Sequence, residues 1–330
     1  MNRKYNKFKT KFDLEMTTEL LYKPFNQRKM IMPIKTLPFA GAPLDLAETE
    51  RSAQQLMAFS KQKNARAYIM HHGDFLVDQS GALIALAPMK LVGQNLYDPG
   101  PLFLGLDGER PIFAFSLDTA KAATALVKGS QLVAIRGLAS RLPAKELALI
   151  GRAKSLFDWH RFHKFCSTCG KESRSMNGGI TRKCPSCSTD HFPRVNPVVI
   201  MLVLKDDMCL LGRGPAWPEG AFSALAGFVS PGESLEEACI REVKEEVGVD
   251  VVDPVYKFSQ PWPFPGQLMI GMECRALSET ITRNPAEIAE ARWFRKADVR
   301  QIFAGESEKY LCPPDFTIAH HLLKNWLSHP

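Results

Sequence analysis

Apolar positions along this chain recur with two different periods, and the changes between them predict where strands and helices lie. Short segments that are mostly apolar, or alternate with polar residues between turn residues, are typical of strands. Longer segments with apolar residues three and four apart are typical of amphipathic helices. We predict strands over residues 67–71, 74–77, 82–86, 111–117, 132–135, 198–204, 208–211, 252–258 and 268–277, and helices over 46–60, 120–128, 143–165, 234–247 and 316–327. This mixture predicts an α/β fold of the mixed α+β kind.

Length and composition predict a globular chain of two domains without a membrane segment. The chain has 330 residues, and domains average about 150 residues. The apolar run over residues 198–204 has seven residues, whereas a membrane-spanning helix needs about 20. No signal-peptide pattern opens the chain. Of the eight cysteines, four have metal-ligand spacing and four are scattered, which predicts a reducing compartment and a cytoplasmic location.

The net charge is concentrated at the N-terminal end and does not indicate a basic groove. The formal charge is +7, and residues 1–30 alone carry eight Lys or Arg against three Asp or Glu. The remaining residues therefore carry only +2, and a zinc ion held by four thiolates would shift the body by about −2 more. We predict a basic, flexible tail over residues 1–32 and a nearly neutral body, which argues against nucleic-acid binding through a strongly basic surface.

The most informative stretch is residues 227–249. Gly227 is followed by five residues and then Glu233. After seven more residues the chain has the sequence REVKEEVGV, from Arg241 to Val249. This arrangement matches the Nudix box at every specified position. Within it, Ser234 and Glu237 have the spacing of a capping box at a helix start, and a glycine at position 248 suits the helix end.

The glutamates of this run are candidate ligands for a divalent cation. Glu242, Glu245 and Glu246 have helical spacings that bring them to one edge of the helix. Like charges so placed repel by a few tenths of a kcal/mol per pair, and a hard ion such as Mg²⁺, which prefers oxygen ligands, turns that repulsion into attraction. An exposed acidic helix without an ion explains these residues alone, but not the spacing of Gly227 and Glu233.

Two C-x-x-C pairs precede this stretch. Cys166 and Cys169 are separated by fourteen residues from Cys184 and Cys187. Four thiolates at such spacing complete a tetrahedron around Zn²⁺ and leave no open position, so we predict one structural zinc ion per chain in a zinc ribbon. A redox pair is the alternative for a single C-x-x-C, and the second pair favours metal.

A proline-rich segment, SQPWPFPGQLM, follows the box over residues 259–269. Its three prolines lack backbone donors and fix φ, which rules out a central strand and predicts a stiff loop. Trp262 and Phe264 alternate with those prolines and present aromatic faces suited to stacking on a nucleobase or nicotinamide. Gln260 offers amide hydrogen bonds. The structural alternative is a packing loop.

Together these features resemble the bacterial NAD(H) pyrophosphatases, a group of Nudix hydrolases also known as decapping enzymes of NAD-capped RNA. The resemblance rests on the complete box, the cysteine pairs and SQPWPFP, and it covers residues 33–327. Two positions depart from the family pattern. Gln267 stands where the family often has serine, and Phe192 stands where many members have tyrosine. Both departures concern the substrate preference rather than the metal site.

The resemblance implies a Nudix α/β/α sandwich preceded by a zinc ribbon and an N-terminal Nudix-like α/β domain. We place the N-terminal domain with a connecting helix at residues 33–158, the ribbon at 159–192 and the catalytic domain at 193–330. The implied reaction is hydrolysis of NAD(H) to nicotinamide mononucleotide and AMP, with NAD-capped RNA as a further substrate. The implied cofactors and assembly are Mg²⁺ or Mn²⁺ for catalysis, structural Zn²⁺, and a homodimer.

The resemblance also assigns residues to this reaction. The catalytic set is Glu233, Arg241, Glu242, Glu245 and Glu246. Glu287 joins the last three glutamates as a metal ligand, with Glu290 as the alternative, and the identity of the general base is left open. The substrate contacts are Phe192, Phe228, Gln260, Trp262, Phe264, Gln267 and Ala319.

Two other functions remain open from the sequence. One is a broader nucleoside-diphosphate-X hydrolase that acts on substrates such as ADP-ribose. Hydrolases of that kind do not generally carry the SQPWPFP segment. The other is an RNA-binding zinc-ribbon protein with a weak hydrolase domain, and the complete set of carboxylates in the box argues against it.

Overall fold

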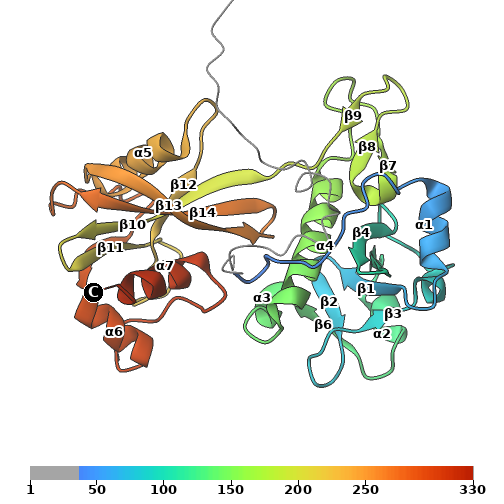
Figure 1. The fold of residues 1–330 in the computed structure, drawn as a ribbon, viewed down its shortest axis with the longest axis horizontal. Coiled ribbons are helices and arrows are strands. Elements are labelled where there is room, and N and C mark those ends of the chain that lie inside the picture. The colour runs from blue at the N-terminus through green and yellow to red at the C-terminus, as the bar shows by residue number, and fades with distance from the viewer. Residues whose placement is uncertain (1–36, 330) are drawn as a thin grey trace, which may run out of the picture. The chain divides into compact units, whose positions relative to one another are not determined.

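The computed structural model describes residues 37–329, which form two six-stranded sheets and one three-stranded sheet (Figure 1). The tail predicted over residues 1–32 lies outside the described residues. One large sheet is built from the N-terminal half of the chain and the other from the C-terminal half, with the small sheet between them in sequence. This order agrees with the mixed α/β fold predicted from the sequence.

The N-terminal sheet has the strand order β4-β5-β1-β2-β6, and β3 pairs with β1. Its strands are β1 Arg66–His71, β2 Asp74–Val77, β3 Ala85–Leu86, β4 Leu102–Asp107, β5 Arg110–Ser116 and β6 Gln131–Ala134. The helical segments of this half are α1 Ala53–Ser60, η3 Pro88–Leu91, α2 Ala120–Ala125, α3 Ile135–Leu138 and α4 Ala144–Phe162. The parallel pairing of β1 with β5 is the one parallel pair among the described strands of this sheet.

Several elements of this half differ from the sequence prediction, among them α3 and η3, which were not predicted. The helix expected over residues 46–60 begins only at Ala53, because the side chain of Ser52 accepts a hydrogen bond from the amide of Gln55 and caps it there. The strand expected over residues 82–86 is a regular strand only at its last two residues, and Leu83 before them forms an isolated bridge with Val77. Strand β4 was not predicted, because Gly105 interrupts its apolar run at a bulge.

Helix α4 is the predicted connecting helix, and it is buried along most of its length. Leu147, Ile150 and Phe157 pack in the same hydrophobic cluster as residues of β2, β4 and β5. The residue at 151 is glycine, and a Cβ there would lie 3.1 Å from the Phe39 ring and 3.6 Å from Pro263. This close approach brings α4 against the proline-rich segment of the C-terminal half.

The small sheet consists of β7 Arg174–Met176, β8 Thr181–Lys183 and β9 Asp190–His191, with the short turn η4 Asn177–Gly179. The side chain of Arg182 is fully buried, and its Nη1 contacts Nδ1 of His160 on α4 at 2.9 Å. His160 in turn contacts the carbonyl oxygen of Gly179 through Nε2 at 2.8 Å. This buried polar chain fixes the small sheet to α4.

The C-terminal sheet has the strand order β13-β14-β10-β11-β15, and β12 pairs with β10. Its elements are β10 Asn196–Lys205, β11 Met208–Arg213, β12 Leu225–Phe228, α5 Leu235–Val247, β13 Val251–Trp262, β14 Gln267–Ala276, β15 Glu290–Arg295, α6 Lys296–Ala304 and α7 Ile318–Leu327. Helix α6 was not predicted from the sequence.

Helices cover both faces of this sheet, with α5 on one side and α6 and α7 on the other (Figure 1). Val199 and Val203 of β10 share a hydrophobic cluster with α5. Ile200 and Leu202, which alternate with them, share a second cluster with α7. Alternate residues of one strand thus pack against helices on opposite faces of the sheet. A three-layer α/β/α arrangement requires this.

The proline-rich segment is partly strand rather than loop. Strand β13 continues to Trp262, where it pairs with Gln267 of β14, and the turn follows over residues 263–266. Proline is tolerated here because β13 is the edge strand of the sheet. The expectation that this segment is not a central strand is therefore confirmed, whereas its interpretation as a loop from residue 259 onward is wrong.

Candidate active site

Helix α5 begins and ends as the sequence predicts. Ser234 accepts a hydrogen bond from the amide of Glu237, and the Glu237 side chain accepts one from the amide of Ser234, so both halves of the capping box are present. Gly248 follows the helix with φ of 73°, in the left-handed region that glycine adopts at little cost. Both ends of the predicted carboxylate helix are therefore fixed locally.

Arg241 organises the carboxylates around this helix. Its Nε and Nη2 donate to the two oxygens of Glu233 at 2.5 and 2.8 Å, and its Nη1 donates to Glu242 at 2.7 Å and to Glu245 at 2.9 Å. The guanidinium lowers the pKa of Glu233 to about 2. The same hydrogen bond to Glu233 is the first cause of a raised pKa of Arg241. These charge-assisted bonds hold Arg241 charged and fix three carboxylates relative to it.

Gly227, at the start of the predicted motif, provides room for Glu242. A Cβ at position 227 would lie 1.8 Å from the carboxyl carbon of Glu242. The backbone of Gly227 does not need a positive φ, so glycine is required here by the available space rather than by backbone conformation. The pairing of β12 with β10, in which Gly227 lies opposite Val199, brings this backbone against the helix.

Glu246 is the buried carboxylate of the site. It is 7% exposed, and its Oε2 has no hydrogen-bond partner among the described residues. Burial is the first cause that raises its pKa, to about 8, followed by the negative charges of Glu242 and Glu287. A buried carboxylate oxygen without a donor, facing two more carboxylates, is an arrangement that a bound cation stabilises. This donor set fits a hard divalent ion.

Glu287 and Glu290 were alternative fourth ligands, and their surroundings differ. The negative charge of Glu287 contributes to the raised pKa of Glu246, and Oε1 of Glu287 accepts a hydrogen bond from the side-chain Nδ2 of Asn284 at 3.3 Å. Glu290 lies 3.8 Å from Arg213 and 3.6 Å from Arg292. The carboxylate near Glu246 is therefore Glu287, whereas Glu290 faces arginines.

The four cysteines of the C-x-x-C pairs come together in the loops beside the small sheet. Their sulfur atoms all lie within 4.8 Å of one another, and within residues 37–329 they form the one such group of three or more ligand atoms. The sulfurs of Cys166 and Cys187 are 3.6 Å apart, and those of Cys169 and Cys184 are 3.5 Å apart. A tetrahedron with metal–sulfur bonds of about 2.3 Å has edges of about 3.8 Å. The cluster thus fits a closed four-thiolate metal site.

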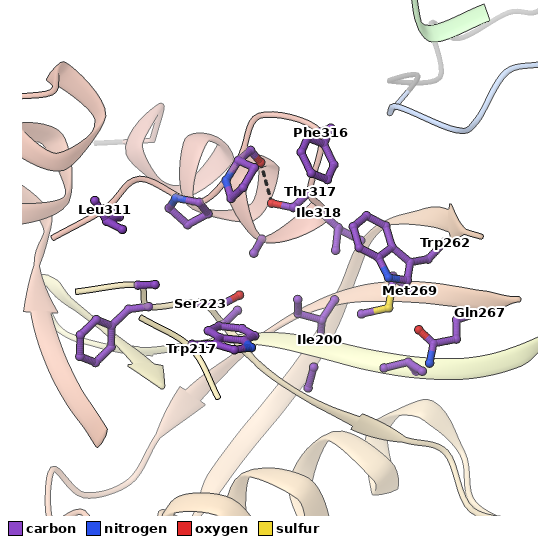
Figure 2. A pocket seen from close by; sticks show the side chains of 18 of the residues that line it. Ile200, Trp217, Ser223, Trp262, Gln267, Met269, Leu311, Phe316, Thr317 and Ile318 are labelled. Carbon is purple, nitrogen blue, oxygen red and sulfur yellow. Dashed lines mark hydrogen bonds between the residues drawn. The ribbon is translucent and has the colours of Figure 1, made fainter. Parts of the chain in front are cut away.

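A pocket of about 670 Å³ opens on the face of the sheet that α7 covers, between β10, β12, β14 and the start of α7 (Figure 2). Its lining is mainly apolar and includes Ile200, Trp217, Phe222, Phe228, Trp262 and Phe316. Gly227 also lines it, and Gly227 lies directly against Glu242. Gly227 therefore adjoins both the pocket and the carboxylate helix, which lie on opposite faces of the sheet.

Four of the seven predicted substrate contacts line this pocket. They are Phe228, Trp262, Gln267 and Ala319. Phe228 is 54% exposed, so its ring is free to meet a ligand. The ring of Trp262 lies parallel to that of Phe316, with the centroids 6.1 Å apart, and meets the rings of Phe39 and Phe264 edge-on.

The other three predicted contacts lie elsewhere. Gln260 is fully buried, and its Nε2 donates to the carbonyl oxygens of Pro38 and Phe316, both at 2.9 Å. Phe264 packs in the hydrophobic cluster of the N-terminal half. Phe192 is 56% exposed and lines a second cavity rather than this pocket. Strand alternation does not separate Gln260 from Trp262, because residues two apart share a face. Gln260 is instead held by its two hydrogen bonds, and Phe264 lies in the turn beyond the end of β13.

Three further residues of this region were not predicted from the sequence. Trp217 and Phe316 line the pocket, and both lie in loops close to prolines. This sequence context distinguishes them from aromatic residues of a hydrophobic core. Arg136 of α3 also lines the pocket, and its guanidinium carbon lies 4.1 Å from the ring centroid of Phe264 and 5.7 Å from that of Trp262. No local pattern marks Arg136, because it is distant in sequence.

Comparison with known proteins identifies the family. The NUDIX domain matches residues 194–314, and the NADH pyrophosphatase-like rudimentary NUDIX domain matches residues 64–159. The NAD-capped RNA hydrolase NudC of Deinococcus radiodurans is 38% identical over 269 residues, which is 80% of this chain and 88% of the relative. The chain belongs to the Nudix hydrolase family. The predicted family, and the Nudix fold with an N-terminal Nudix-like domain, are thereby confirmed.

Two relatives of this Nudix hydrolase come from mammals. The NAD-capped RNA hydrolase NUDT12 of Homo sapiens is 42% identical over 198 residues, 57% of this chain and 43% of the relative. The mitochondrial NAD(P)H pyrophosphatase NUDT13 of Mus musculus is 36% identical over 213 residues, 61% of this chain and 60% of the relative. The Nudix hydrolase described here thus spans less than two thirds of either mammalian protein. None of its described helices combines the length and apolar character needed to cross a membrane.

Proposed function

We propose that this enzyme hydrolyses the diphosphate of NAD(H) to nicotinamide mononucleotide and AMP, and that it removes NAD caps from RNA. The observation that carries the proposal is that Gly227 lines the apolar, aromatic pocket and at the same time lies against Glu242 of the carboxylate helix. A dinucleotide needs both features, because its heterocycle is flat and apolar whereas its diphosphate is anionic. The names of the Deinococcus, human and mouse relatives support the same substrate class.

The carboxylates, Arg241 and the aromatic pocket would have different roles in this reaction. Glu242, Glu245, Glu246 and Glu287 would hold Mg²⁺ or Mn²⁺. Such ions, when bound, neutralise the diphosphate and lower the pKa of bound water. Arg241 orients Glu242 and Glu245 through its hydrogen bonds and keeps the junction at Glu233 closed. The aromatic rings of the pocket exclude water from the heterocycle and position the diphosphate at the carboxylates.

We assign the cysteine cluster a structural Zn²⁺. Four sulfur ligands leave no open position for water or substrate. The cluster joins loops that flank strands of only two or three residues, and such short elements cannot bury much apolar surface. The ion would therefore contribute directly to the folding free energy of this part of the chain.

The organisation of the chain follows from these assignments as a further part of the proposal. We place the N-terminal domain at residues 33–158, the zinc ribbon at 159–192 and the catalytic domain at 193–330. The family resemblance implies a homodimer, which light scattering of the purified protein tests. Eight free cysteines, four of them in the metal cluster, support a reducing compartment such as the cytoplasm.

The proposal is tested by product analysis with NADH, ADP-ribose and NAD-capped RNA side by side. We expect reduced nicotinamide mononucleotide from NADH, nicotinamide mononucleotide from the capped RNA, and slower turnover of ADP-ribose. Glu246→Gln should lower turnover by roughly 10²-fold or more at saturating Mg²⁺, because metal activation of water is worth several kcal/mol. Glu236→Gln, on an exposed position of the same helix, is the matched control. Preferred hydrolysis of ADP-ribose would favour the broader hydrolase instead.

A further inference from the structure

A second cavity of about 970 Å³ adjoins the substrate pocket and has a different chemical character. It is lined by residues of α4, of the segment after Phe39, of the segment that precedes β10, and of the turn between β13 and β14. Trp262 and Gln267 line both cavities, and Figure 2 shows these two residues together at one end of the substrate pocket. A ligand that extends past Gln267 therefore enters the second cavity.

Positive charge predominates in this second cavity. Among the described residues that line it are three arginines, Arg51, Arg152 and Arg194, against a single acidic residue, Glu48. Arg51 is committed to the fold, because its guanidinium donates to the carbonyl oxygens of Leu46, Phe103 and Asn177. The cations left for a ligand are Arg152 and the exposed Arg194.

Arg152 is the arginine of this cavity that is best suited to bind an anion. It is half-buried on α4, and its Nε is fully buried without a hydrogen-bond partner among the described residues. No salt bridge of Arg152 occurs within residues 37–329. Burial lowers the pKa of Arg152, and the negative charge of Glu48 opposes that shift. Buried guanidinium nitrogens are normally hydrogen-bonded, and phosphate offers the paired acceptors that a guanidinium fits.

We propose that this second cavity binds a phosphate group carried by a ribose of the substrate, with Arg152 as its main contact and Arg194 as a second cation. The inference rests on the proposed function, since the occupant is part of the same substrate. Two sources share this chemistry, namely the 2′-phosphate of NADP(H) and the first 3′-phosphodiester of an NAD-capped RNA. Phe192 lines the same cavity with an exposed ring, which suits the base of a following nucleotide.

The test compares Arg152→Gln with the wild type on NADH, NADPH and an NAD-capped dinucleotide RNA, with kcat and KM measured separately. We expect the variant to lower kcat/KM for the phosphate-bearing substrate by roughly 10- to 100-fold more than for NADH, mainly through KM, as loss of a hydrogen bond to a charged group implies. A loss of kcat/KM on NADPH alone would identify the 2′-phosphate as the bound group, and a loss on the capped RNA alone would identify the 3′-phosphodiester. Arg152→Lys, which keeps the charge, should recover part of the loss.

Arg300→Gln is the matched control, because it removes an exposed arginine that lines neither cavity. Equal loss by Arg152→Gln on all three substrates, loss on none of them, or a changed oligomeric state in light scattering would overturn the inference. Calorimetric binding of NADPH and NADH, without added Mg²⁺ or Mn²⁺, gives the same comparison independently of turnover. If the wild type fails to hydrolyse NADH, the proposed function fails, and this binding comparison still decides the role of Arg152.

Discussion

Gly227 and Glu242 occupy one space, since a Cβ on the glycine would lie 1.8 Å from the carboxyl carbon of the glutamate. The substitution Gly227→Ala therefore forces Glu242 away from its place beside Arg241. We expect turnover to fall by roughly 10²-fold or more, because one of the carboxylates that would hold the metal is displaced and metal activation is worth several kcal/mol. Steady-state kinetics at saturating Mg²⁺ measure this loss.

The matched control for Gly227→Ala is Gly137→Ala in α3. A Cβ at position 137 meets the side chain of Val133 at 3.5 Å, an ordinary contact. This variant should keep wild-type turnover. If Gly227→Ala were also fully active, the close approach to Glu242 would be irrelevant to catalysis, and the carboxylate assignment would lose its geometric support.

Removal of one thiolate tests the zinc assignment. Cys184 is fully buried in the cluster, so Cys184→Ser should lower both the metal content and the melting temperature. Elemental analysis of the wild type should find about one zinc per chain. Cys312→Ser, which lies outside the cluster, should retain the metal. A wild-type protein without zinc, or a Cys184→Ser variant with unchanged metal content and melting temperature, would exclude a structural ion.

Trp262 tests the specificity of the pocket. Its ring is held by Phe39, Phe264 and Phe316, so little ordering is needed when substrate binds. Stacking on a flat heterocycle is worth about 1–3 kcal/mol. Trp262→Ala should therefore lower kcat/KM for NADH by roughly 5- to 150-fold, at about 1.4 kcal/mol per factor of ten.

The control for Trp262→Ala is a second substrate rather than a second variant. ADP-ribose lacks the nicotinamide, so its kcat/KM should change much less if that ring stacks on Trp262. The ratio between the two substrates does not depend on the fraction of misfolded protein. Equal loss on both substrates would mean that Trp262 stacks on the adenine that they share, or that its ring only packs the surrounding segment. No loss on either would remove Trp262 from the substrate site.

The buried His160 makes stability depend on pH. Burial is the main cause that lowers its pKa from 6.5 to about 4, and its ring bonds Gly179 and Arg182. Below pH 6.5 the unfolded chain takes up a proton that the folded chain does not, so stability is lost as the pH falls from about 6.5 to about 4. This loss is on the order of 3 kcal/mol, at 1.36 kcal/mol per pKa unit.

The measurement compares the unfolding midpoint of wild type and His160→Gln between pH 7 and pH 4. The variant should start less stable and lose less stability on acidification, because glutamine does not titrate. Acid also weakens thiolate binding to metal, but both proteins carry the same cysteines, so that contribution cancels. Parallel curves for the two proteins would show that His160 does not carry the pH dependence.

The carboxylate helix was predictable because its signals are local. The capping box of Ser234 and Glu237 and the glycine at 248 act within a few residues, and each is present where the sequence predicts it. The cysteine pairs are similar, since each pair needs only a tight turn and the four sulfurs then converge. These features depend on backbone hydrogen bonds between neighbours, which the order of residues sets directly.

The surroundings of the pocket depended on contacts between distant segments. The sequence predicted Gln260, Trp262 and Phe264 as one group, whereas Gln260 is held by hydrogen bonds to Pro38 and Phe316, and Phe264 lies in the turn after β13. The family resemblance assigned Glu287, with Glu290 as the alternative, and the structure distinguishes them by the effect of Glu287 on the pKa of Glu246 and by the arginines around Glu290.

The sequence by itself therefore determined the chemistry of this protein, and the tertiary structure decided which residues surround that chemistry. A motif specifies residue types along a helix or a turn, because its interactions reach three or four positions. Whether a side chain such as Arg152 lacks a partner, or one such as Glu246 is buried, depends on strands and helices that pack from far along the chain. That packing is set by the whole core rather than by local pattern.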